Sequence, residues 1–204
     1  MIVLSIADDE AIRQAVAAIQ RGTLIVAPTD TVYGLMCSPF DSAAIERVYQ
    51  AKQRPQTKAL PVLIADADDV FKVARAMPSR ARALAAYFWP GALTMTLPKR
   101  DDLPPNLSHY ETIAVRMPDH DFCRALIRAA GGVLAATSAN RSGGHNATTI
   151  QQAIDHLGES VALYLDGGST PGDVASTVVE LHEDELVILR EGVITRQMLE
   201  KIRP

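Results

Sequence analysis

The segment 52–58 carries the residues best suited to binding an anion. Lys52, Arg54 and Lys58 supply three cations within seven residues, at the end of a predicted helix. Cations near a helix C-terminus are favoured by the helix dipole, so a purely structural role stays open. Pro55, however, stops the helix and turns the chain toward an apolar segment. We interpret this arrangement as one that directs Arg54 and Lys58 at a single anion.

Arg116 stands on a predicted strand that is otherwise apolar. Side chains alternate along a strand, so Thr112, Ala114 and Arg116 share one face. An arginine among apolar side chains is costly unless a negative group pairs with it. A carboxylate of a ligand would satisfy Arg116, and an internal salt bridge is the alternative. We favour a ligand site.

Two polar motifs follow buried strands. Thr31 lies in P-T-D-T-V-Y-G-L at residues 28–35, and the ends of strands are where open α/β sheets bind ligands. A tight turn whose side chains bond their own backbone is an equal alternative. Ser138 and Asn140 precede a glycine loop, and they offer donors and acceptors for a phosphate, a ribose or an amino acid. A plain turn would explain that motif as well.

Two further polar residues belong to the last predicted strands. Ser176 opens the run S-T-V-V, and Arg190 ends an apolar strand just before Glu191 and Gly192. Arg190 is either a surface residue that terminates the strand or another phosphate contact. The segment 138–148 is the largest polar, glycine-rich loop, and we hypothesise that it is a lid.

The familiar motifs of other chemistries are absent from the sequence. It has no phosphate loop of the G-x-x-x-x-G-K-[ST] type, no G-x-G-x-x-G, no H-E-x-x-H and no G-x-S-x-G. The five histidines are scattered in polar surroundings. Cys37 and Cys123 each lie beside apolar residues without a partner at metal-ligand spacing, so we expect reduced thiols and no metal site.

Composition limits the class of protein. The chain has 204 residues, 48% hydrophobic and 22% charged, and a net charge of −4, which fits one globular domain over 1–204. A protein that grips nucleic acid mainly by its phosphates would be basic. The N-terminus has no basic n-region and no apolar stretch approaches eighteen residues, so we expect a soluble cytoplasmic protein.

Strands and helices alternate along most of the chain. A link at 182–185 looks like a hairpin, so we expect a mixed α/β sheet and not a purely parallel one. The predicted helices cover about 8–21 (capped by Asp8 or Asp9), 42–52, 67–76, 78–88, 120–130, 149–157 and a last one from Thr195. The predicted strands cover 23–27, 60–64, 92–97, 112–117, 133–137, 161–165, 175–181 and 186–190.

Taken in order, the motifs resemble one family. The set is P-T-D-T-V-Y-G-L, K-x-R-P followed by Lys58, T-x-A-V-R-M-P, S-A-N-x-S-G, S-T-V-V and L-R-E-G. It is similar to the YrdC-like threonylcarbamoyl-AMP synthase family, in its short single-domain form. The resemblance implies a single α/β domain, with a twisted mixed sheet flanked by helices around a deep, positively lined cavity. It covers a core of about 8–192 and implies no separate C-terminal domain.

The resemblance also implies an activity. Family members join L-threonine, bicarbonate and ATP into threonylcarbamoyl-AMP and release pyrophosphate, with Mg²⁺ bound through the phosphates. They pass the adenylate to a threonylcarbamoyl transferase complex that modifies adenosine in tRNA. Weak binding of tRNA or double-stranded RNA, and no membrane partner, are part of the same expectation.

Site residues are carried over from the family by position. The resemblance assigns Lys52 and Arg54 as a basic catalytic pair. It assigns the threonine contacts to Thr31, Arg116, Ser138 and Ser176. It assigns the ATP contacts to Arg54, Lys58, Thr112, Asn140, Thr148 and Arg190. One departure concerns Leu63, which stands where some longer relatives have a histidine that helps to bind threonine.

Two other functions stay open at this point. One is an RNA-binding or translation-associated protein without catalysis, which the acidic charge and the few aromatic residues disfavour. The other is a carbamoyl-adenylate enzyme of another pathway, because a similar domain occurs inside hydrogenase-maturation proteins. ATP consumption that requires threonine would separate all three.

Overall fold

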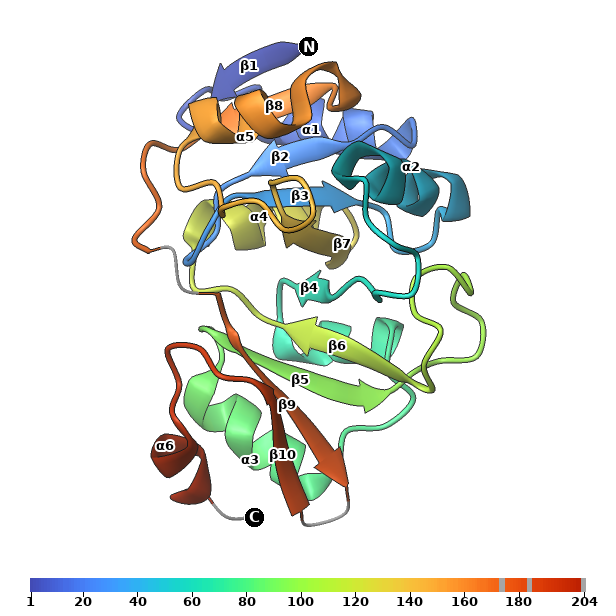
Figure 1. Ribbon diagram of the computed structural model, residues 1–204, viewed down its shortest axis with the longest axis vertical. Coiled ribbons are helices and arrows are strands. Elements are labelled where there is room, and N and C mark those ends of the chain that lie inside the picture. The colour runs from blue at the N-terminus through green and yellow to red at the C-terminus, as the bar shows by residue number, and fades with distance from the viewer. Residues whose placement is uncertain (173–174, 183–184, 203–204) are drawn as a thin grey trace.

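A computed structural model describes residues 1–172, 175–182 and 185–202. Their ten strands form one mixed sheet, which runs from the N-terminal end of the molecule to the C-terminal end (Figure 1). In spatial order the strands are β1 (Ile2–Ser5), β8 (Leu163–Asp166), β2 (Ile25–Ala27), β3 (Gly34–Cys37), β7 (Val133–Ser138), β4 (Val62–Ile64), β6 (Thr112–Arg116), β5 (Leu93–Pro98), β9 (Thr177–His182) and β10 (Glu185–Arg190).

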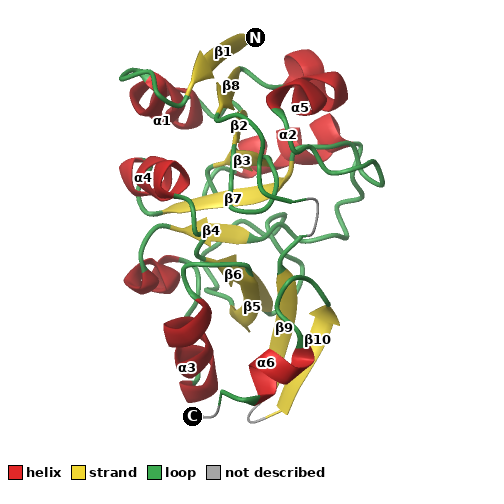
Figure 2. Ribbon diagram, turned by 90° about the vertical axis from the view of Figure 1, so that its left-hand side faces the viewer, coloured by secondary structure: helices red, strands yellow, loops and turns green. Residues whose placement is uncertain are grey.

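Helices cover both faces of the sheet. The α-helices are α1 (Ala11–Gln20), α2 (Ser42–Lys52), α3 (Ser79–Phe88), α4 (Asp121–Ala129), α5 (Ile150–Leu157) and α6 (Arg196–Glu200), and the short 3₁₀ helices are η1 (Ala67–Lys72) and η2 (Gly158–Ser160). In the N-terminal half of the sheet, α1 and α4 lie on one face and α2 and α5 on the other (Figure 2). The expected mixed sheet flanked by helices is confirmed.

Most helix starts follow the sequence signals. Asp41, His120, Thr149 and Thr195 cap α2, α4, α5 and α6 through their side chains, because each accepts a hydrogen bond from a backbone N–H in the first turn. The predicted cap of the first helix is wrong. Glu10 is its N-cap residue, and a carboxylate oxygen of Asp8 accepts from the Glu10 N–H in the turn before it.

Two strands and one helix differ from the prediction. β1 and β3 were not predicted, because both are short. β1 pairs with the distant β8, and β3 lies between nearby β2 and the distant β7. The helix predicted over 67–76 is the shorter 3₁₀ turn η1. It ends there because Ala74 pairs with Lys99 and the Arg75 N–H donates to the Pro98 carbonyl, so the chain is bound to the end of β5. The hairpin of β9 and β10 is antiparallel as predicted, although 183–184 lie outside the described residues.

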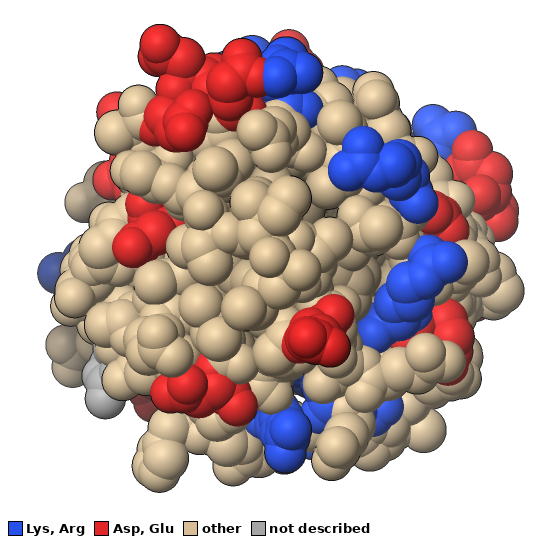
Figure 3. Space-filling view, turned by 90° about the horizontal axis from the view of Figure 1, so that it is seen from above, with Lys and Arg blue, Asp and Glu red and all other residues tan. Residues whose placement is uncertain are grey.

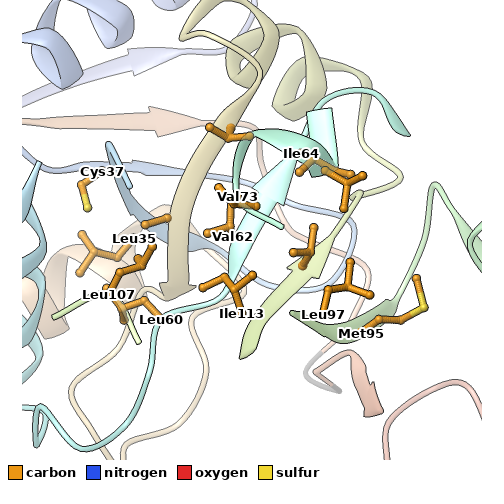
Figure 4. Close-up of a cluster of buried hydrophobic side chains, with 14 of the residues drawn as sticks. Leu35, Cys37, Leu60, Val62, Ile64, Val73, Met95, Leu97, Leu107 and Ile113 are labelled. Atoms are coloured by element: carbon orange, nitrogen blue, oxygen red, sulfur yellow. The ribbon is translucent and has the colours of Figure 1, made fainter. Parts of the chain in front are cut away.

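The core is divided by the sheet into two apolar clusters. The larger one contains the inner faces of α2, α3 and α5, and the smaller one contains those of α1 and α4. Figure 4 shows part of the larger cluster. Its labelled side chains include Val62 and Ile64 of β4, Leu97 of β5 and Ile113 of β6, together with Leu107. Because the central strands are buried on both sides, they provide a rigid base for the polar residues at their ends.

The surface around β1 carries no continuous basic stripe. Figure 3 shows this end of the molecule as a broad uncharged area, and the basic side chains around it are interspersed with acidic ones. A track for a nucleic-acid backbone would need basic residues in a row across the face. In the described part of the chain, no helix has the length and apolar character needed to cross a membrane.

Candidate active site

A cavity of about 240 Å³ opens in the middle of the sheet. Its walls come from the loop between β2 and β3, from β4, β6 and β7, and from the region where β5, β9 and β10 lie side by side. The motifs at the strand ends therefore meet at one place, although they are spread over most of the chain. This confirms the expected cavity.

Three arginines give the cavity its charge. Arg54, Arg116 and Arg190 line it, and none of its described lining residues is Asp or Glu. Burial lowers the pKa of Arg54 and of Arg190, and the nearby charge of Arg116 lowers the pKa of Arg190 further. Arginine still keeps its charge at neutral pH, because its ordinary pKa lies far above neutrality. The cavity is thus suited to a ligand with several negative charges.

Arg116 has the internal salt bridge that the sequence left as one of two alternatives. It forms a buried ion pair with Asp30, and its Nη1 donates to the Thr31 hydroxyl at 3.1 Å while its Nε donates to the Gly91 carbonyl at 3.0 Å. The preference for a ligand over an internal salt bridge is corrected, because Asp30 supplies the carboxylate. Arg116 nevertheless lines the cavity, so its remaining N–H groups are placed to meet a ligand.

Hydrogen bonds of the Thr29 hydroxyl stabilise the turn that carries Thr31. The Thr29 hydroxyl donates to the Val32 carbonyl at 2.7 Å and accepts from the backbone N–H groups of Thr31 and Val32. The self-bonded turn proposed as an alternative is therefore present. It also positions Thr31 against Arg116, so the turn and the site are the same feature.

Lys52 is buried behind the cavity and does not line it. Its ammonium donates to the carbonyls of Ser138 and Asn140, both at 2.5 Å, and to the Asn140 side-chain oxygen at 3.3 Å. Burial, with Arg54 nearby, lowers the pKa of Lys52 to about 7. The role of Lys52 in a basic catalytic pair with Arg54 stays a prediction, because Arg54 lines the cavity and Lys52 does not. The side chain holds the loop after β7 in place.

That loop is closely tied to the rest of the protein. The Ser138 hydroxyl donates a hydrogen bond to the Asn140 side-chain oxygen, and the Asn140 side-chain amide donates to the Gly144 carbonyl at 2.6 Å. The Tyr33 backbone accepts from Ala139 and donates to Ala147, which fixes both ends of the segment. Motion of a lid would therefore be confined to the turn around Gly143, and the lid hypothesis stays a prediction.

Ser176 and Arg190 form the opposite wall. Two nitrogens of the Arg190 guanidinium, Nε and Nη2, donate to the Ser176 carbonyl at 3.1 and 2.9 Å, and Nη2 also reaches the Ser176 hydroxyl at 3.2 Å. The Ser176 hydroxyl is in turn 2.7 Å from that of Thr94 on β5. Arg190 is therefore both an exposed residue at the end of its strand and a residue that lines the cavity.

Comparison with known proteins places the chain in a family. The family model named Sua5_yciO_yrdC, with the description "Telomere recombination", matches residues 17–192. The chain belongs to the Sua5/YciO/YrdC family. Two relatives named threonylcarbamoyl-AMP synthase, from Bacillus subtilis and Pyrococcus abyssi, are 40% identical over 197 residues and 37% identical over 192 residues. These matches cover 96% and 94% of this chain but 57% and 56% of the relatives, so the chain spans little more than half of their length.

Solved structures of Sua5/YciO/YrdC proteins have the same fold. P. abyssi Sua5 complexed with L-threonine superposes with a TM-score of 0.94 at 35% identity, covering 98% of this chain and 60% of that one. E. coli YciO gives 0.82 at 28% identity and covers 94% of both chains. Full-length HypF gives 0.79 at 17% identity over 89% of this chain and 29% of that one, which shows a shared fold alone.

The cavity contains some, but not all, of the site residues that the family resemblance predicted. Six of the eleven predicted site residues line the cavity: Thr31, Arg54, Arg116, Ser138, Ser176 and Arg190. The other five are not among its lining residues: Lys52, Lys58, Thr112, Asn140 and Thr148. Lys58 is exposed, and Thr148 contacts Gln152 in the first turn of α5. Their roles stay predictions.

Sequence reasoning missed several residues of this Sua5/YciO/YrdC site. Thr94 and Asn146 line the cavity, and Asp30 is the partner of Arg116. The only sign of Thr94 in the sequence was a hydroxyl side chain on a strand of alternating character. Many exposed strands carry such hydroxyls, so this sign did not indicate a site. Leu63 lines the cavity as well, so the departure noted in the sequence lies inside the site.

Proposed function

We propose that this chain makes threonylcarbamoyl-AMP and pyrophosphate from L-threonine, bicarbonate and ATP. The observation that carries the proposal is the cavity, which joins three arginines to several hydroxyl groups and, among its described lining residues, contains no carboxylate. The names of relatives at 35–40% identity support it, as does the likeness to a Sua5 structure that holds L-threonine. The chemistry fits, because every intermediate of this reaction is an anion.

The threonine site would consist of Thr31, Arg116, Ser138 and Ser176. The planar guanidinium of Arg116 matches the geometry of a carboxylate, and its contacts with Asp30 and Thr31 hold it in one orientation. Hydroxyl groups on either side of the cavity can then contact the amino, hydroxyl or carbamate groups of the substrate. Leu63 would offer threonine an apolar contact, at the position where some longer relatives have a histidine.

The ATP site would use the remaining predicted residues. Arg54 and Arg190 are the cavity cations available for phosphates, since Arg116 is paired with Asp30. Lys58, exposed on the segment after α2, would meet the outer phosphates. Thr112, Asn140 and Thr148, which are not among the lining residues of the cavity, would also contact the nucleotide. Lys52 would act indirectly, by holding the Ser138 and Asn140 carbonyls.

The reaction needs positioning and charge neutralisation more than a covalent nucleophile. The neutral amine of threonine adds to the carbon of bicarbonate, and water leaves to give a carbamate. A carbamate oxygen then attacks the α-phosphorus of ATP, the bond to the β-phosphate breaks, and pyrophosphate departs. Arginines held around the cavity stabilise the charge that develops on the phosphates.

Mg²⁺ would bind through the phosphates of ATP. Within the described residues, no group of three or more His, Cys, Asp or Glu side chains is placed to hold a metal ion. An ion that keeps several waters and uses phosphate oxygens needs no such cluster. When bound, it would neutralise charge on the triphosphate, while Arg54 and Arg190 do the same from the protein side.

We propose further that the enzyme works in the cytoplasm and supplies a downstream threonylcarbamoyl transferase complex. Cys37 and Cys123 are free thiols, in keeping with a reducing compartment. Direct binding of tRNA or double-stranded RNA would be weak, because the net charge is −4 and the face in Figure 3 has no basic stripe. The adenylate would therefore pass to the transferase without a tight complex with RNA.

The proposal is tested by pyrophosphate release on the purified chain, in ATP, Mg²⁺ and bicarbonate, with L-threonine, with L-valine or with no amino acid. We expect release that needs L-threonine and a product with the mass of threonylcarbamoyl-AMP. Lys58→Ala should lower the rate. Arg75→Ala is the matched control, because Arg75 is an exposed cation outside the cavity that pairs with exposed Asp101. Release that is the same without an amino acid would contradict the proposal.

A further inference from the structure

Two hydroxyl groups from neighbouring parallel strands meet in the wall of the cavity. Thr94 lies on β5 and Ser176 immediately precedes β9, and their oxygens are 2.7 Å apart. Both side chains are buried, and both line the cavity. Thr94 belongs to none of the motifs that carry the family resemblance, so its role has to come from this contact.

The hydrogen bonds around Ser176 limit where its proton can point. A hydroxyl oxygen has one hydrogen and two lone pairs. Arg190 Nη2 donates to one lone pair of Ser176, at 3.2 Å. If Thr94 donates to the other, both lone pairs are filled and the Ser176 hydrogen has to point elsewhere, toward a ligand in the cavity.

We propose that Thr94 is a positioning residue that makes the Ser176 hydroxyl a donor to a negatively charged oxygen of the amino-acid substrate. The inference rests on the proposed function and names a residue beyond it. The position of Arg190 does not depend on Thr94, because two of the Arg190 nitrogens donate hydrogen bonds to the Ser176 carbonyl. Loss of the Thr94 hydroxyl therefore affects the amino-acid contact and leaves the cation that faces ATP in place.

The test compares four proteins with the wild type: Thr94→Val, Thr94→Ser, Ser176→Ala and the double variant Thr94→Val/Ser176→Ala. Valine keeps the shape of threonine and removes the hydroxyl, whereas serine keeps the hydroxyl. We expect Thr94→Val to raise the KM for L-threonine about fivefold to tenfold, the range for one lost hydrogen bond, with the KM for ATP unchanged. Thr94→Ser should stay close to the wild type. Thr94→Val should add nothing in the Ser176→Ala background, because both changes remove the same contact.

The outcomes separate this inference from the proposed function. An active wild type with an unchanged KM for L-threonine in Thr94→Val overturns the inference and leaves the function standing. Effects that add in the double variant, or a rise in the KM for ATP, overturn it as well, because they indicate general damage to the cavity. L-threonine affinity measured by calorimetry requires no turnover, and a wild type with neither threonine-dependent activity nor threonine binding overturns both.

Discussion

The guanidinium of Arg116 is paired with the carboxylate of Asp30 across the cavity wall, although 86 residues separate them in the chain. Arg116 ends β6, and Asp30 lies in the loop between β2 and β3, on the other side of β4 and β7 in the sheet. The pair joins the two halves of the sheet at the place where the cavity opens. It therefore contributes to stability and to the shape of the site at once.

Asp30→Ala should destabilise the protein strongly. Only 8% of the Arg116 side chain and 11% of the Asp30 side chain are exposed, so the variant leaves a buried cation without its counter-ion. Breaking such a pair costs about 3–5 kcal/mol. Urea unfolding would measure it. Asp101→Ala removes the exposed partner of Arg75 and should cost less than about 1 kcal/mol. Equal losses in the two variants would show that burial of the pair is unimportant.

Arg190→Lys should impair the enzyme even though the charge is retained. The guanidinium spans the carbonyl and the hydroxyl of Ser176, and a single ammonium group cannot make the same set of bonds. Loss of charged hydrogen bonds of this kind lowers kcat/KM for ATP by roughly tenfold to a hundredfold. Initial rates at varied ATP would measure this, with Arg75→Lys as the control on the surface. A variant within twofold of the wild type would remove Arg190 from the ATP site.

Lys52 should make stability rise with pH. Its pKa is about 7 in the folded protein and 10.5 ordinarily, so between these values the unfolded chain binds more protons than the folded one. Raising the pH through this window therefore favours folding. Compared with Lys52→Met, the free energy of unfolding of the wild type should increase by about 2 kcal/mol from pH 7 to pH 9. Parallel curves for the two proteins in urea unfolding would contradict this role for Lys52.

Gly192→Ala should disturb the wall that holds Ser176. A Cβ at this position would lie 2.3 Å from the Ala175 carbonyl oxygen and 2.6 Å from the Thr177 backbone nitrogen, so the backbone around Ser176 has to move. Overpacking of this kind costs about 1–3 kcal/mol, and we expect a clear fall in activity. Gly143→Ala is the comparison. It meets nothing within 4 Å but has a φ of +84°, so it should cost about 1 kcal/mol and affect activity less. Full activity in Gly192→Ala would contradict the close packing at this position.

Local signals predicted much of the secondary structure. Caps such as Asp41 and Thr149 satisfy backbone N–H groups within their own first turn, so the residues near them are sufficient to place the helix start. Alternation and apolar runs located most strands in the same way. β1 was not predicted, because its partner β8 lies about 160 residues away. β3 was not predicted either, because it is a short strand that pairs with β7, about a hundred residues away, as well as with nearby β2.

The site was predictable as a set of residue types and not as a geometry. The sequence by itself determined the family, through the order of its motifs. It also determined that Arg116 has a negative partner, because an arginine on an apolar strand requires one. The sheet order decided that the partner is Asp30, that Lys52 is turned inward to the loop after β7, and that Thr94 meets Ser176. Hydrogen bonds act over about 3 Å, and only the folded chain brings residues so far apart in sequence within that range.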